Sequence, residues 1–129
     1  YILQDVIDFC ELPISPERYT KMVCYGSFSY LEESRAEVLL GLLRENFPNL
    51  QRIFIGNCPD RNLIMEFSGD RDLESGFESN PDSPIGIWRT EADFIKLAER
   101  CGWKAIIHRM PTNYYAAHYR YDVILVKNE

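Results

Sequence analysis

The stretch Lys21-Met22-Val23-Cys24-Tyr25-Gly26-Ser27 decides the fold, because a short apolar strand leads directly into a tight turn. The apolar run is continuous rather than alternating, which is typical of a parallel strand that is covered on both faces. A second apolar run follows at 52–56, and helical patterns lie after each of the two runs. This alternation predicts an α/β fold with a partly parallel sheet.

Two amphipathic patterns predict helices that flank the strand at 52–56. The first helix opens on a capping box, in which Ser34 caps the chain and Glu37 can reach back to its backbone. The second is capped by Thr90 and ends at Gly102, which is placed for a left-handed C-terminal cap. One apolar stripe marks the first helix: Ala36, Leu39, Leu40, Leu43 and Phe47.

The last part of the chain predicts two strands, at 103–109 and 119–127. The loop that joins them, 111–118, has no helical pattern, so the strands must be an antiparallel pair. Several tyrosines lie in and after this loop. They can either form the floor of a pocket or pack against each other across the two strands. These are Tyr114, Tyr115, Tyr119 and Tyr121.

The chain divides into four consecutive segments of one predicted domain. These are a lead-in at 1–18, a strand–helix–strand unit at 19–56, an insert at 57–89, and a helix with the antiparallel pair at 90–129. Within the insert, residues 66–83 are rich in glycine, proline, serine and acidic residues, and they include few large apolar side chains. This composition predicts a mobile surface loop or lid that buries little area.

Composition narrows the function classes. The 129 residues carry a net charge of −6, which argues against a nucleic-acid-binding protein. No apolar run reaches the length of a membrane span, and no signal peptide is recognisable. The cysteines have neither C-x-x-C pairing nor histidine at ligand spacing, so we expect no metal site and a reducing, cytoplasmic setting. They are Cys10, Cys24, Cys58 and Cys101.

The ordered set of elements resembles the C-terminal half of class I S-adenosylmethionine-dependent methyltransferases. The segments 22–31 and 50–56 are similar to the fourth and fifth strands of the family, and 91–103 is similar to its last helix. Gln4-Asp5-Val6 resembles the acidic site after the third strand. The resemblance implies a partial Rossmann-like sheet of strands four to seven, whose family order is third, second, first, fourth, fifth, seventh, sixth.

The glycine-rich loop of this family does not occur in the 129 residues. The resemblance would place it before Tyr1, which predicts a truncated domain that is inactive alone. It also predicts that the edge of the fourth strand is exposed, so that either a missing N-terminal half or strand pairing between molecules covers it. Self-association through this edge is one of these two expected outcomes.

The resemblance assigns site residues by position. The cofactor, S-adenosylmethionine, would contact six residues: Asp5, Val6, Tyr25, Gly26, Ser27 and Phe28. From the residues alone, the favoured interpretation of Asp5 is an ordinary exposed acid at the end of a strand. Gly26 is equally well explained as a simple turn glycine. The methyl acceptor, a small molecule, would contact Tyr30, Asn57, Asp60 and Trp88.

Methyl transfer from a sulfonium needs little acid–base chemistry, so the sequence names no catalytic residue. Three functions remain open. The chain is part of a small-molecule methyltransferase, a non-catalytic methyltransferase-like module for interaction or regulation, or the second half of another nucleotide-binding α/β domain.

Overall fold

The computed structural model describes residues 4–128, which form one four-stranded sheet with the order β1-β2-β4-β3. Strand β1 (Lys21–Tyr25) is parallel to β2 (Arg52–Pro59). Strand β4 (Arg120–Lys127) is antiparallel to both β2 and β3 (Trp103–His108). The predicted α/β class and the predicted strand order, fourth-fifth-seventh-sixth, are thus confirmed. The third strand that the resemblance places before the acidic site at Asp5 falls largely on residues 1–3, which lie outside the described part.

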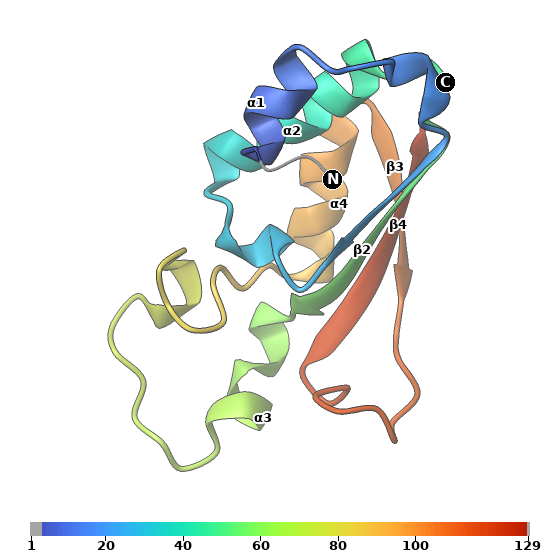
Figure 1. The fold of residues 1–129 in the computed structure, drawn as a ribbon. Helices are drawn as coiled ribbons and strands as arrows, with labels where there is room; N and C mark the ends of the chain where they lie inside the picture. The colour runs from blue at the N-terminus through green and yellow to red at the C-terminus, as the bar shows by residue number, and fades with distance from the viewer. Residues whose placement is uncertain (1–3, 129) are drawn as a thin grey trace.

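Three helices lie on the same side of the sheet: α1 (Val6–Glu11), α2 (Glu33–Asn46) and α4 (Glu91–Arg100) (Figure 1). The insert contributes the short α3 (Ile64–Ser68) beyond the end of β2. Single 3₁₀ turns occupy Pro16–Arg18, Phe28–Tyr30, Arg61–Leu63 and Phe77–Ser79. None of the described helices is long and apolar enough to cross a membrane.

The two predicted helix starts have different outcomes. The cap of α4 is confirmed, because the Thr90 hydroxyl accepts a hydrogen bond of 3.0 Å from the Asp93 backbone N–H. The capping box of α2 is wrong. This helix begins at Glu33, one residue before the expected Ser34 cap, and no side chain caps it. Glu37 does not reach back to the helix start but accepts hydrogen bonds from Arg100, so a tertiary contact overrides the local motif.

The main core lies between the three helices and the inner face of the sheet. Trp103 is fully buried there, and its indole N–H donates to the Leu40 carbonyl at 3.0 Å. Gly102, with φ +84°, ends α4 in the left-handed conformation that the sequence predicts. The strands supply alternate side chains to this core, among them Ile53, Ile55, Val123 and Leu125.

The outer face of the sheet is uncovered by any described residue. Val23 and Tyr25 on β1 are 71% and 63% exposed, so the prediction that β1 is covered on both faces is wrong for residues 4–128. A continuous apolar run does not reveal by itself whether a second layer is present.

The insert buries more apolar surface than the sequence predicts. Phe67 and Phe77 pack against the fully buried Trp88, and Tyr119 from the start of the last strand region joins them. Ring centroids in this second cluster are 5.1–6.5 Å apart. Three of the rings come from the insert itself, but Tyr119 lies 31 residues beyond Trp88, so the composition of the insert alone could not reveal the cluster. That the insert acts as a lid stays a prediction.

Candidate functional site

An apolar cavity of about 400 Å³ lies beside β1, bounded by α1 and α2. Four of the six predicted cofactor residues line it, namely Val6, Tyr25, Ser27 and Phe28. The rest of the wall is largely aliphatic, with side chains from β1, β2 and α2. The structure thus brings most of the predicted set together at the carboxyl end of β1.

The turn after β1 shapes the mouth of this cavity. Gly26 has φ +69°, and its N–H donates to the Gly56 carbonyl at 3.1 Å. A Cβ built on Gly26 would meet no atom within 4 Å, so the backbone conformation, and not crowding, requires glycine here. The Cys24 sulfur and the Ser27 hydroxyl oxygen lie 3.2 Å apart, within hydrogen-bond distance, just before the 3₁₀ turn at Phe28–Tyr30.

Asp5 does not line the cavity, although it directly precedes Val6. Its carboxylate accepts a hydrogen bond of 2.9 Å from the Ile7 N–H and thereby caps α1. The same carboxylate is 3.3 Å from the guanidinium of Arg35 on α2. In this structure the side chain orients α1, and its contact with a cofactor stays a prediction.

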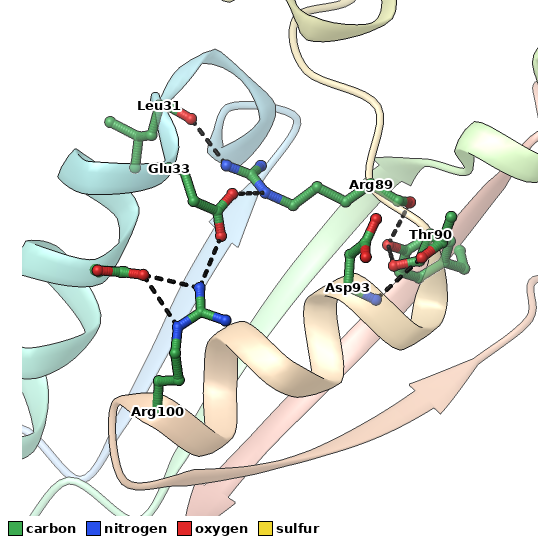
Figure 2. A network of polar contacts seen from close by, with 8 residues as sticks. Leu31, Glu33, Arg89, Thr90, Asp93 and Arg100 are labelled. Carbon is green, nitrogen blue, oxygen red and sulfur yellow. Dashed lines mark hydrogen bonds and ion pairs between the residues drawn. The ribbon is translucent and has the colours of Figure 1, made fainter.

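A second, charged cavity of about 490 Å³ opens on the other side of the 3₁₀ turn at Phe28–Tyr30. Its wall combines residues of the insert, such as Arg61 and Trp88, with charged residues of α2 and α4. Figure 2 shows the network at its centre, where Glu33 lies between two guanidinium groups. Glu33 accepts from Arg89 at 3.2 Å and from Arg100 at 3.2 Å.

Arg89 separates the two cavities. Its side chain is only 5% exposed, and it also donates to the Leu31 carbonyl at 2.9 Å (Figure 2). The guanidinium carbon lies 5.2 Å from the centroid of the Phe28 ring. Phe28 lines the apolar cavity and Arg89 lines the charged one, so this stacked pair forms the partition between them.

Two of the predicted substrate residues hold the insert in place. The Tyr30 hydroxyl donates to the Pro84 carbonyl at 2.6 Å. Trp88 lines the charged cavity but is fully buried, and its indole N–H has no partner among the described residues. Their contact with a substrate stays a prediction.

The other two predicted substrate residues lie elsewhere. Asp60 is buried and forms an ion pair with Arg109. Asn57 has φ +68°, and its N–H donates to the Asp122 carboxylate at 2.9 Å. Asn57 also lines a space of about 10 Å³ next to Phe28 and Arg89, which is room for one water molecule. The four substrate candidates therefore do not share one cavity.

Sequence reasoning missed Arg89, Glu33 and Arg100 as members of the site. Arg89 and Arg100 contact Glu33 across 56 and 67 residues of sequence, so no local spacing marks the network. The hydrogen bond to Glu37 raises the pKa of the Arg100 guanidinium further, so Arg100 keeps its charge.

Two weakly acidic side chains near Arg89, a thiol and a tyrosine hydroxyl, keep their protons because they are buried. Burial raises the pKa of the Cys58 thiol and of the Tyr121 hydroxyl, which donates to the Arg89 carbonyl at 2.9 Å. Both groups are therefore neutral at ordinary pH and offer no nucleophile. Within residues 4–128, no cluster of three histidine, cysteine or carboxylate side chains could hold a metal ion.

Comparison with known proteins gives structural likeness only. No family model and no curated protein matches the sequence. Among solved structures, LepI in complex with S-adenosylhomocysteine and a substrate analogue matches 98% of this chain at 13% identity, with a TM-score of 0.63. The magnesium protoporphyrin IX methyltransferase of Synechocystis, with bound S-adenosylhomocysteine, matches 98% at 13% identity and a TM-score of 0.59. The mitomycin 7-O-methyltransferase MmcR matches 99% at 13% identity and a TM-score of 0.60.

The chain spans 30%, 50% and 33% of the lengths of these three structures. At such low identity the likeness establishes the fold alone. Together with the strand order β1-β2-β4-β3, it shows that the chain has the fold of the C-terminal half of a class I methyltransferase.

Proposed function

We propose that this chain supplies one half of the cofactor site of an S-adenosylmethionine-dependent methyltransferase that acts on a small molecule. The fold supports the proposal, as do the solved structures that resemble it, which include methyltransferases of magnesium protoporphyrin IX and of mitomycin.

The apolar cavity is the observation that carries the proposal. Ligands of open α/β sheets bind at the carboxyl ends of the strands, and this cavity extends along β1 from Met22 to the turn at its carboxyl end. Its volume of about 400 Å³ is in the usual range for small-ligand sites. Val6 and Phe28 would hold the apolar parts of the cofactor, and Ser27 offers a hydroxyl. The exposed ring of Tyr25 could attract a cationic sulfonium.

The charged cavity is suited to bind the methyl acceptor. Methyl transfer requires an acceptor held close to the sulfonium and in line with it. Phe28 in the wall of the apolar cavity contacts Arg89 in the wall of the charged one. Residues of the insert, among them Arg61 and Trp88, form part of the wall, so the insert would select the acceptor. The mixture of positive and negative side chains favours a polar acceptor over a purely apolar one.

We further propose that residues 1–129 do not catalyse methyl transfer alone, because their sequence lacks the glycine-rich loop that holds the cofactor in this family. Strand β1 is an edge of the described sheet, so a further strand, from adjoining sequence or from a second molecule, would pair with it. The four cysteines are free, which supports a reducing compartment such as the cytoplasm.

Calorimetric titration with S-adenosylhomocysteine tests the proposal, both on this chain and on the longest polypeptide that contains it. Tyr25→Ala should weaken binding severalfold, whereas Tyr115→Ala, at a 94% exposed tyrosine away from the cavity, should not. If neither polypeptide binds the ligand, the enzymatic proposal fails.

One alternative has a specific observation in its favour. A solved structure described as a pericyclic reaction enzyme matches 98% of this chain with a TM-score of 0.63, so this fold also serves chemistry other than methyl transfer. A module that binds S-adenosylhomocysteine but transfers no methyl group to any acceptor would support this non-methylating alternative. Binding of a different nucleotide instead of S-adenosylhomocysteine would support the remaining alternative, that the chain is the second half of another nucleotide-binding α/β domain.

A further inference from the structure

The insert leaves the sheet at the end of β2 and returns to it at the start of α4 (Figure 1). Backbone hydrogen bonds join its two ends. The Arg89 N–H donates to the Pro59 carbonyl at 3.2 Å, and the Arg61 N–H donates to the Arg89 carbonyl at 3.4 Å. The Tyr121 hydroxyl donates to the same Arg89 carbonyl. The insert is therefore a closed loop, and its base carries the arginine that contacts Phe28.

One side chain from outside the insert, Arg109, binds a carboxylate at each end of it. Its guanidinium forms ion pairs with Asp60, which begins the first 3₁₀ turn of the insert, and with Glu91, the first residue of α4. It also donates to the Arg120 carbonyl at 3.3 Å, and its central carbon lies 5.2 Å from the centroid of the Tyr121 ring. Because Arg109 directly follows β3, these contacts join β3, β4, the insert and α4.

Burial makes the contact with Asp60 different from an ordinary surface ion pair. The Asp60 side chain is only 3% exposed, and it also accepts a hydrogen bond of 3.0 Å from the Asn62 N–H. Among residues 4–128, Arg109 is the only cation that forms an ion pair with this carboxylate. Displacement of Arg109 would leave a buried charge unpaired, which is costly. It would therefore favour arrangements in which the start of the insert moves and exposes Asp60 to water.

The contacts of Arg109 require the shape of a guanidinium as well as its charge. One terminal nitrogen meets both carboxylates, while the other meets the Arg120 carbonyl. A guanidinium holds its N–H donors in one rigid plane, whereas a lysine ammonium is a compact charge on a flexible stem. Lysine at this position would keep the charge balance but not the fixed distance between the two ends of the insert.

We infer that Arg109 is a positioning residue of the charged cavity, which holds both ends of the insert and thereby fixes the insert wall and Arg89. Arg109 itself lines neither cavity, so it acts through Asp60 and Glu91. The inference rests on the proposed function only where it treats this cavity as the acceptor site. No residue of the insert lines the apolar cavity, so loosening of the insert should leave that cavity unchanged.

Hydrogen exchange measured by mass spectrometry tests the inference on the 129-residue chain without any ligand. In Arg109→Lys, the protected amides of 61–89 should exchange about tenfold faster, because the base of the insert opens more often. Peptides from α2 and from 52–56 should keep the rates of the parent chain. Glu91→Gln, which removes only the carboxylate at the exposed end, should give a smaller rise confined to the same segment.

The Arg89 side chain gives a second readout. Its Nε–H donates to Glu33 at 3.2 Å, and the signal of this group in the ¹⁵N spectrum should shift or broaden in Arg109→Lys. A general loss of stability would not produce this change in the folded state. The matched control is Arg35→Lys, at an exposed arginine that pairs with Asp5 away from the insert. The control should alter neither the exchange of the insert nor the Arg89 signal.

Unchanged exchange within the insert of Arg109→Lys would overturn the inference. Faster exchange across the whole molecule, with an unchanged Arg89 signal, would overturn it as well, because Arg109 would then contribute to overall stability alone. Neither outcome depends on S-adenosylhomocysteine. A loosened insert, in a polypeptide that does not bind S-adenosylhomocysteine, would refute the proposed function and still support the role of Arg109 in holding the insert.

Discussion

The guanidinium carbon of Arg89 lies 5.2 Å from the centroid of the Phe28 ring, and this pair divides the apolar cavity from the charged one. Arg89 is held from the far side by the Glu33 carboxylate and the Leu31 carbonyl. The position of the partition therefore depends on contacts between the insert boundary and the start of α2. In the proposed enzyme, it would set the distance between cofactor and acceptor.

Replacing Arg89 should destabilise the fold strongly. Arg89→Met removes a buried, charged donor and leaves the Leu31 carbonyl without this partner, so we expect the free energy of unfolding to fall by about 2–3 kcal/mol. Urea denaturation measures it. Arg100→Met, at an exposed arginine that pairs with the same Glu33, is the matched control and should change the stability much less. Equal losses for both variants would contradict the partition role.

The Tyr30 hydroxyl should restrain the insert. Tyr30→Phe removes its hydrogen bond to the Pro84 carbonyl, at a cost of about 1 kcal/mol. Limited proteolysis within 61–87 should then proceed about fivefold faster, because local opening becomes more frequent. Tyr115→Phe should leave the cleavage rate unchanged, since Tyr115 is almost fully exposed. Unchanged cleavage in Tyr30→Phe would show that the aromatic cluster alone holds the insert.

Two glycines should respond to alanine with opposite signs. Gly41 lies within α2, and an added Cβ would meet nothing within 4 Å, so Gly41→Ala should stabilise the protein by about 1 kcal/mol. A Cβ on Gly56 would lie 2.5 Å from Tyr25 Cδ2 and 2.8 Å from Phe54 Cε1. Gly56→Ala should therefore destabilise by about 1–2 kcal/mol and displace the Tyr25 ring. Thermal unfolding of the two variants measures both effects, and a stabilised Gly56→Ala would contradict the close packing of Tyr25.

Much of the fold could be predicted from local patterns. The run at Lys21–Tyr25, the Thr90 cap and the left-handed Gly102 depend on chemistry within a few residues, and the structure confirms each of them. The convergence of Val6, Tyr25, Ser27 and Phe28 on one cavity agrees with the positions that the resemblance implied.

The rest could not be predicted because it depends on contacts between distant segments. Glu37 looked like a capping residue, but Arg100 binds its carboxylate from 63 residues away. Phe67 and Phe77 lie in a segment of loop-like composition, and they are partly buried because they pack against Trp88 and Tyr119. Asp60 is charged, yet it is buried because Arg109 pairs with it.

Stability should fall at alkaline pH through Cys10. Burial raises the pKa of this thiol from its ordinary value of 9.0 to about 11. Above pH 9 the thiol ionises in the unfolded chain but stays neutral in the folded one, so stability is full below pH 9 and decreases up to pH 11. The loss through this thiol should reach about 2–3 kcal/mol.

Urea denaturation at a series of pH values measures this effect against Cys10→Ala. Cys10→Ala loses packing, and therefore stability, at every pH. The readout is therefore the slope of the free energy of unfolding against pH between pH 9 and 11. The slope should be smaller in Cys10→Ala than in the parent chain. Identical slopes would show that Cys58 and Tyr121, whose pKa values burial also raises, account for the whole effect.

The central claim is that the apolar cavity beside β1 forms part of an S-adenosylmethionine site. The most direct test is an NMR titration of the ¹⁵N-labelled chain with S-adenosylhomocysteine. Saturable shifts are expected for the amide signals of Val6, Tyr25, Ser27 and Phe28, and no shift is expected at Lys104 on the outer face. The absence of shifts at the four cavity residues with excess ligand, or shifts at Lys104 without shifts at those four residues, would contradict this assignment.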